Sequence, residues 1–142
     1  MLIRTSSKQI YDWDGLFSMM LITKQRYENL EIWKNSIEIA KDFCYITEKL
    51  EELHLDKFSQ HLREICIQIS NHLAEISTTS SKINITRSLT NAHLLTLEAE
   101  NSIMIFYEHD LIDSETNKNL VQKLNRLNKE IENSLSVLCG SK

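Results

Sequence analysis

Apolar residues recur every three or four positions through most of this chain, which is the spacing of an α-helix with one buried face. The pattern predicts helices over about residues 30–53, 57–77 and 83–109, and a fourth that follows Asp113 or Ser114 and extends to Leu138. The polar stretch "STTSSK", residues 77–82, separates the second from the third. Because short links join long helices, neighbours must run antiparallel. The sequence therefore predicts an all-α, antiparallel up-down-up-down four-helix bundle over residues 27–142.

Each predicted helix has one main apolar stripe, which we expect to form the bundle core. The stripes consist of Tyr27, Leu30, Trp33, Ile37, Ala40, Cys44 and Thr47; Phe58, Leu62, Ile65, Ile69, Leu73 and Ile76; Ile85, Leu89, Ala92, Thr96, Ala99, Ile103 and Phe106; and Leu120, Leu124, Leu127, Ile131, Leu135 and Leu138. Polar side chains that accept from unpaired backbone N–H groups are expected to cap three of the helices. These are Asn29 for the first, Asp56 for the second, and Asp113 or Ser114 for the fourth.

The first and third helices carry more apolar residues than one core stripe needs. In the first helix a second stripe, which includes Phe43 and Leu50, lies about 100° around the axis from the first. In the third helix Leu95 and Ile105 belong to the surplus. A second apolar stripe exposed to water usually marks an interface. The sequence therefore predicts self-association through Ile32, Ile39, Phe43, Ile46, Leu94, Leu97 and Met104.

Composition supports the helical interpretation, and charge narrows the choice of partners. The 142 residues include no proline and only two glycines, so few residues interrupt a helix. The formal net charge is −4; residues 1–26 contribute +2 and the remainder −6. An acidic body argues against broad, nonspecific capture of RNA or DNA phosphates. A local basic patch remains open as a nucleic-acid site, and its candidate residues are Lys118, Arg126 and Lys129 with Arg63 and Arg87.

The cysteines and the N-terminal segment bear on the cellular compartment in which the protein is expected. Cys44, Cys66 and Cys139 are odd in number and widely spaced, which favours a reducing cytoplasm over disulfides or a zinc site. Each occupies an apolar position, so we expect all three to be buried. The run "LFSMMLI" is too short to span a membrane. Residues 1–26 are expected to be an N-terminal extension, either a short helix against the bundle or a misassigned start upstream of Met20.

Several segments resemble a known family. The stretch "YENLEIW" matches an aromatic-x-x-Leu-x-x-Trp opening, "LREICIQISNHLAEI" matches a second-helix segment, and "LEAEN" matches a Glu-x-Glu segment of the third helix. Together they resemble the bacterial four-helix-bundle proteins encoded in intervening sequences of 23S ribosomal RNA genes. The matched polar residues are Glu75, Glu98 and Glu100. Ser70 and Ile76 replace a family proline and glycine, so the second helix is expected to run straighter and longer.

The resemblance implies a small cytoplasmic homo-oligomer, commonly a ring of five bundles, with no established enzymatic activity. Proteins related to that family, the accessory variability proteins of diversity-generating retroelements, bind a reverse transcriptase and nucleic acid. Those relatives are markedly basic, whereas this chain is acidic. A nonenzymatic, self-associating scaffold or adaptor without a cofactor is therefore the leading hypothesis, and binding of RNA, DNA or a reverse transcriptase is the alternative.

A di-iron carboxylate bundle is a more distant alternative. Such a site needs a Glu-x-x-His pair on each of two helices and an inward Glu on each of the others. Only Glu51 and His54 have that order here. We expect His72 and Glu75 to form a structural hydrogen-bonded pair instead, partnered by Glu98 or Glu100 from the third helix. No catalytic residue or metal ligand is therefore predicted.

Overall fold

The computed structural model describes Tyr27 and residues 30–139. These residues form four α-helices and no strand, which confirms the all-α class. The helices are α3 (Glu31–Glu52), α4 (Asp56–Glu75), α5 (Lys82–Glu108) and α6 (Ser114–Leu138), and the short 3₁₀ helix η2 (Ile76–Thr78) follows α4. The predictions for residues 1–26 and for Asn29 lie outside the described residues.

The helices begin where side chains or turns satisfy their first N–H groups. Asp113 caps α6, since its carboxylate accepts from the Thr116 backbone N–H at 2.7 Å. Ser81 caps α5 through the Asn84 N–H. The prediction for Asp56 was wrong: this residue is the first of α4, which has no side-chain cap. An acidic residue in the first turn still interacts favourably with the helix dipole.

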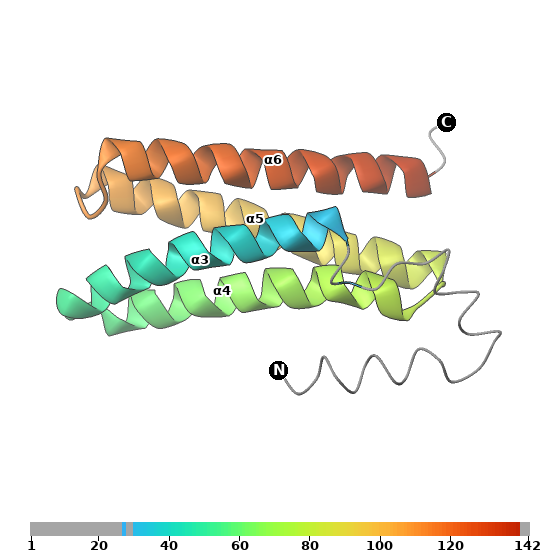
Figure 1. Ribbon diagram of the computed structural model, residues 1–142, viewed down its shortest axis with the longest axis horizontal. Coiled ribbons are helices and arrows are strands. Elements are labelled where there is room, and N and C mark those ends of the chain that lie inside the picture. Colours follow the sequence, from blue (N-terminus) through green and yellow to red (C-terminus); the bar gives the residue numbers. More distant parts are fainter. Residues whose placement is uncertain (1–26, 28–29, 140–142) are drawn as a thin grey trace.

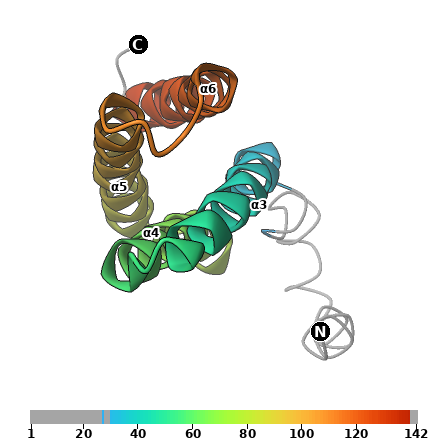
Figure 2. The same ribbon diagram turned by 90° about the vertical axis from the view of Figure 1, so that its left-hand side faces the viewer.

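The helices pack in chain order into a helical bundle. The links α3–α4 and α5–α6 lie at one end, and the link between α4 and α5 lies at the other (Figure 1). Each helix packs extensively on the next along the chain, whereas α3 and α6 contact each other less than these consecutive pairs do. Viewed from its end, the bundle is an arc with α3 and α6 at its two tips (Figure 2). The α3–α6 side is therefore the open side of the bundle.

Two turns built alike close the helical hairpins without glycine. His54, after α3, and Asp110, after α5, have φ of 64° and 59°, in the left-handed region. Beyond each, the backbone N–H of a leucine donates back to the end of its helix, from Leu55 to Leu50 and from Leu111 to Phe106. Both leucines pack against the core. This is the Schellman arrangement that usually uses glycine.

The core of α3 uses the stripe that was predicted to be the self-association surface. Ile39, Phe43 and Ile46 are each at most 3% exposed, and Ile32 is half-buried against the core. Ile39, Phe43 and Ile46 were therefore wrongly predicted as interface, because their side chains are buried within a single bundle, whereas Ile32 keeps part of its surface exposed. The stripe continues through Leu50, which keeps it apolar to the end of the helix.

The stripe of α3 predicted to be core lies at the side of the helix. Trp33, Ile37 and Ala40 are half-buried and line a groove of about 430 Å³ between α3 and α4. Tyr27 lines it too, with its ring 5.2 Å from that of Trp33 in an edge-to-face arrangement. Cys44, on the same side, is exposed. Toward the C-terminal end of α3, Thr47 is the member of this stripe that is buried as predicted.

Candidate functional site

The outer face of α5 is the most apolar exposed surface on one helix. Leu94 and Met104 are each 58% exposed and Leu97 is 43% exposed, while Ile105 next to them is 46% exposed. Figure 2 shows α5 at the edge of the bundle, with no other described helix outside it. Leu94, Leu97 and Met104 were predicted to lie in an interface, and their exposed side chains are free to contact a partner. We call Leu94, Leu97, Asn101 and Met104 the outer α5 face.

The middle of the inner side of α5 is built from smaller residues than the outer α5 face. The middle of the buried stripe consists of Ala92, Thr96 and Ala99, each fully buried. Small side chains let α4 and α6 approach α5 closely. The larger leucines and methionine on the opposite side are not needed for the bundle core. In the middle of α5 the large apolar side chains therefore lie on the outer α5 face, where no other described helix covers them.

Polar contacts border the outer α5 face on both sides. Toward α4, His61 Nε2 lies 3.0 Å from Glu98 Oε2, with both side chains about half exposed. Toward α6, His93 Nδ1 lies 2.9 Å from the side-chain oxygen of Asn128, which is buried. An apolar strip between polar borders has the composition of an interface core with a polar rim.

Glu100 lies beside this second contact and has an unusual environment. Burial raises the pKa of its carboxyl, while a hydrogen bond with Asn128 and the nearby His93 act in the opposite direction. Its Oε2 atom is buried and has no hydrogen-bond partner among the described residues. A carboxylate with an unsatisfied buried oxygen destabilises a bundle when it is ionised. Glu100 is therefore the least satisfied acidic group at the α5–α6 contact.

The polar residues of the resemblance do not form one site. Glu75 accepts from Ser88 Oγ at 2.9 Å, and its Oε1 lies 3.2 Å from His72 Nδ1. The predicted His72–Glu75 pair is thus present, but its partner from α5 is Ser88. The predicted partners Glu98 and Glu100 contact other groups instead. Glu75 ties the end of α4 to the start of α5, which is a structural role.

The five predicted basic residues are distributed over three helices. Lys118, Arg126 and Lys129 are exposed on α6 and share one side of it. Arg63 on α4 forms an ion pair with Glu51, and Arg87 on α5 donates to the side chain of Asn84. The structure therefore brings three of the five onto one helix face and engages the other two in local contacts.

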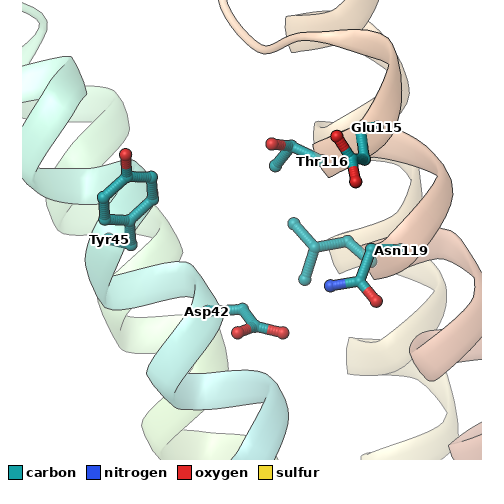
Figure 3. Close-up of a pocket in the computed structure, with 6 residues that line it drawn as sticks. Asp42, Tyr45, Glu115, Thr116 and Asn119 are labelled. Carbon is teal, nitrogen blue, oxygen red and sulfur yellow. The ribbon is translucent and has the colours of Figure 1, made fainter.

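The α3–α6 side holds a cleft that sequence reasoning missed. Its volume is about 490 Å³, and Asp42 and Tyr45 of α3 face the start of α6 across it (Figure 3). Lys123 Nζ lies 2.7 Å from the Asp42 carboxylate and neutralises it. The other residues that line the cleft are Glu115, Thr116, Asn119 and Leu120. The packing of α3 on α6 brings these residues together, and no sequence motif marks them.

Comparison with known proteins adds no relative to this geometry. No family model, curated protein or solved structure matches the chain. The resemblance to the 23S ribosomal RNA intervening-sequence family therefore remains a prediction from the residues quoted above. Function has to be argued from the surfaces themselves.

The described residues were compared with the requirements of a metal site and of a membrane span. Within it, no group of three or more His, Cys, Asp or Glu side chains is placed to hold a metal ion. Glu51 of the Glu-x-x-His sequence accepts from Ser59 and pairs with Arg63. Among residues 30–139, no helix has the combination of length and apolar character needed to cross a bilayer.

The prediction for the cysteines held for one of three. Cys66 is buried, and burial raises the pKa of its thiol to about 12. Cys44 and Cys139 are exposed, contrary to the prediction. Cys139 follows the last turn of α6, and Cys44 lies on the side of α3 that also carries Trp33, Ile37 and Ala40. All three are free thiols.

Proposed function

We propose that this protein is a nonenzymatic, self-associating scaffold or adaptor of the 23S ribosomal RNA intervening-sequence family. Its fold is an antiparallel up-down-up-down four-helix bundle, in keeping with the turns that lie at alternating ends. The observation that carries the proposal is the outer α5 face, where Leu94, Leu97 and Met104 remain exposed after the core is complete. Large exposed apolar residues on one face are typical of an association surface.

Free thiols, one of them buried in the core, agree with a reducing compartment, so the proposal places the protein in the cytoplasm. The partner of the scaffold is first of all another copy of the chain. Light scattering coupled to size-exclusion chromatography at about 10 µM, within the concentration range in which standard-sized interfaces hold together, is the test. The expected result is a mass above the 16.6 kDa of one chain. A monomer under these conditions would contradict the proposal.

A second candidate function is an accessory role toward RNA or DNA and a reverse transcriptase. The observation that favours it is the exposed trio Lys118, Arg126 and Lys129 on one side of α6. Such binding would act through phosphates and weaken as salt rises.

The test of this second function is retention of a single-stranded RNA and a duplex DNA at low salt. Reversing the three charges to Glu is expected to abolish retention, whereas Lys57→Glu on α4 is the matched control and leaves it intact. Equal retention by the triple variant would rule out this surface.

A further inference from the structure

The outer α5 face belongs to a regular second seam along the helix. The residues follow the alternating spacing of four and three that defines a coiled-coil seam. They are Ile83, Arg87, Thr90, Leu94, Leu97, Asn101, Met104 and Glu108. Each is offset by two positions from a residue of the buried stripe, or about 200° around the axis. The seam therefore lies opposite the core and suits another helix as its partner.

All eight seam residues are exposed. Ile83 at the start of the helix is 71% exposed, so apolar surface extends well beyond the central leucines. The seam is about 38 Å long at 1.5 Å per residue. A helix of similar length is needed to cover it, and α5 itself is such a helix.

Charge along α5 is divided between its two halves. Residues 82–97 include Lys82 and Arg87 and no acidic residue. Residues 98–108 include three acidic residues and no Lys or Arg, namely Glu98, Glu100 and Glu108. A second α5 that runs in the opposite direction brings each basic half against an acidic half. A parallel α5 brings like charges together, which is unfavourable.

We propose that two copies of this chain pair through α5 in an antiparallel, two-fold arrangement. This inference rests on the proposed self-association and specifies its surface and symmetry. In a two-fold contact the same patch is used by both copies, so the patch must be complementary to itself. The seam of α5 meets that condition in shape, because its residues are regularly spaced along one helix. It meets the condition in charge, because its basic half is complementary to its acidic half.

The seam also sets the alignment of the two helices. Leu94 packs on Leu97 of the partner subunit, and the two-fold axis repeats this contact to make the apolar centre. Outward from it, Asn101 faces Thr90 of the partner subunit, so two polar side chains meet and can hydrogen-bond. Further out, Arg87 lies against Met104 of the partner subunit and one turn from its Glu108. The polar pairs fix the alignment, as a polar seam residue does in coiled coils.

The first test measures mass on the full chain. Wild type is expected at twice the 16.6 kDa of one chain. Leu97→Glu places two carboxylates, one from each copy, in the apolar centre of the seam, where they repel each other and lose their hydration, so this variant is expected to be a monomer. The control is Val137→Glu, since Val137 on α6 is 80% exposed and lies outside the seam. Circular dichroism checks that both variants keep their helices.

The second test determines direction. Arg87→Glu alone and Glu108→Arg alone are each expected to weaken pairing by about tenfold, because each places like charges together. The double variant is expected to restore pairing, since in antiparallel helices the two exchanged charges meet again. In a parallel pair each position faces its own copy, so wild type and every variant set like against like, and neither single substitution weakens pairing.

The outcomes separate this inference from the proposed function. A multimer that Leu97→Glu does not dissociate would overturn the α5 contact and leave self-association standing. A particle of five subunits would overturn the two-fold arrangement, because such a ring uses two different surfaces on each copy. A monomeric wild type would overturn both. A dimer that the charge exchange fails to restore would contradict the antiparallel direction.

Discussion

Helices α3 and α5 both carry apolar residues beyond one stripe, and the structure uses the surplus in opposite ways. In α3 one stripe, with Phe43 and Ile46, enters the core, and the other lines the groove against α4. In α5 the inner stripe is complete and the outer α5 face has no cover from the described helices. Similar apolar content therefore does not imply a similar role. The additional apolar residues of α3 lie against α4, whereas those of α5 are exposed.

The largest expected difference between the two helices concerns stability. Phe43→Ala removes a side chain that is 1% exposed in the core of α3 and should lower the free energy of unfolding by about 3–5 kcal/mol. Leu97→Ala on α5 should change the stability of one bundle by less than about 0.5 kcal/mol. Urea titrations at one dilute protein concentration measure both. Similar losses for the two variants would erase the distinction between core and outer face.

The turns that follow the two helices should respond alike. A left-handed residue with a side chain costs about 1 kcal/mol relative to glycine. His54→Gly after α3 and Asp110→Gly after α5 are therefore each expected to stabilise the bundle by about 0.5–1 kcal/mol. Thermal unfolding checks this, with His109→Gly as the control, because His109 lies before the left-handed position. Destabilisation by His54→Gly would mean that its side chain holds the turn.

The two helices also present one carboxylate each toward α6, and these should differ in their pH response. Asp42 of α3 has Lys123 as its partner, whereas burial raises the pKa of Glu100 of α5. A raised carboxyl pKa means that ionisation destabilises the fold, so the cost is absent at low pH and grows as pH rises through the folded-state pKa.

Glu100→Gln should therefore raise the melting temperature at pH 7, with little difference from wild type at pH 3. Asp42→Asn should lower the melting temperature at pH 7, because it leaves Lys123 without its partner. A neutral effect of Glu100→Gln at both pH values would show that the carboxylate is solvated.

Thiol reactivity distinguishes an exposed position on α3 from a buried position on α4 without any change in stability. Cys44 of α3 is exposed, and Cys66 of α4 is buried with its pKa raised to about 12. A thiol reagent at pH 8 should label Cys44 and Cys139 in the native protein within minutes and Cys66 only after denaturation, since thiolates are the reactive species. Mass spectrometry of the labelled peptides identifies each site. Rapid labelling of Cys66 would place it at the surface.

Sequence periodicity predicted the helices well because their boundaries have local causes. The capping carboxylate of Asp113 and the polar residues around Ser81 are visible in the sequence, and the observed helices begin within two residues of the predicted positions. The exposure of the outer α5 face was also predictable from the sequence. Leu94, Leu97 and Met104 lie about 200° around the helix from the buried stripe, so one core cannot bury both.

The prediction of which stripe of α3 is buried was wrong, because both stripes are apolar at the start of the helix. The stripe of Trp33 becomes polar at Glu51, while the stripe of Phe43 remains apolar through Leu50. A core face has to stay apolar along the whole contact, so the second stripe is buried. The α3–α6 cleft escaped prediction for a different reason: its residues are far apart in sequence and meet only through the packing of the first helix on the last.

The polar end of α4 shows what one replaced residue does. Ser70 stands where the resembled family has proline, and its hydroxyl lies 3.1 Å from that of Ser36 on α3. Proline would have removed this contact and a backbone hydrogen bond. The α-helix ends at Glu75, one residue before Ile76, and the chain continues as η2 without a left-handed exit.

An apolar pocket between the start of α3 and the end of α6 has a consequence for the connectivity of the chain. Leu30 and Ile32 at the start of α3 line it together with Val137 and Leu138 at the end of α6. The first and last turns of the bundle are thus neighbours, and a short peptide joining them would not need to disturb any helix. New ends opened in the turn at His54 would then give a circularly permuted chain that begins with α4 and finishes with α3. The packing of the four helices is in this sense independent of where the polypeptide is cut.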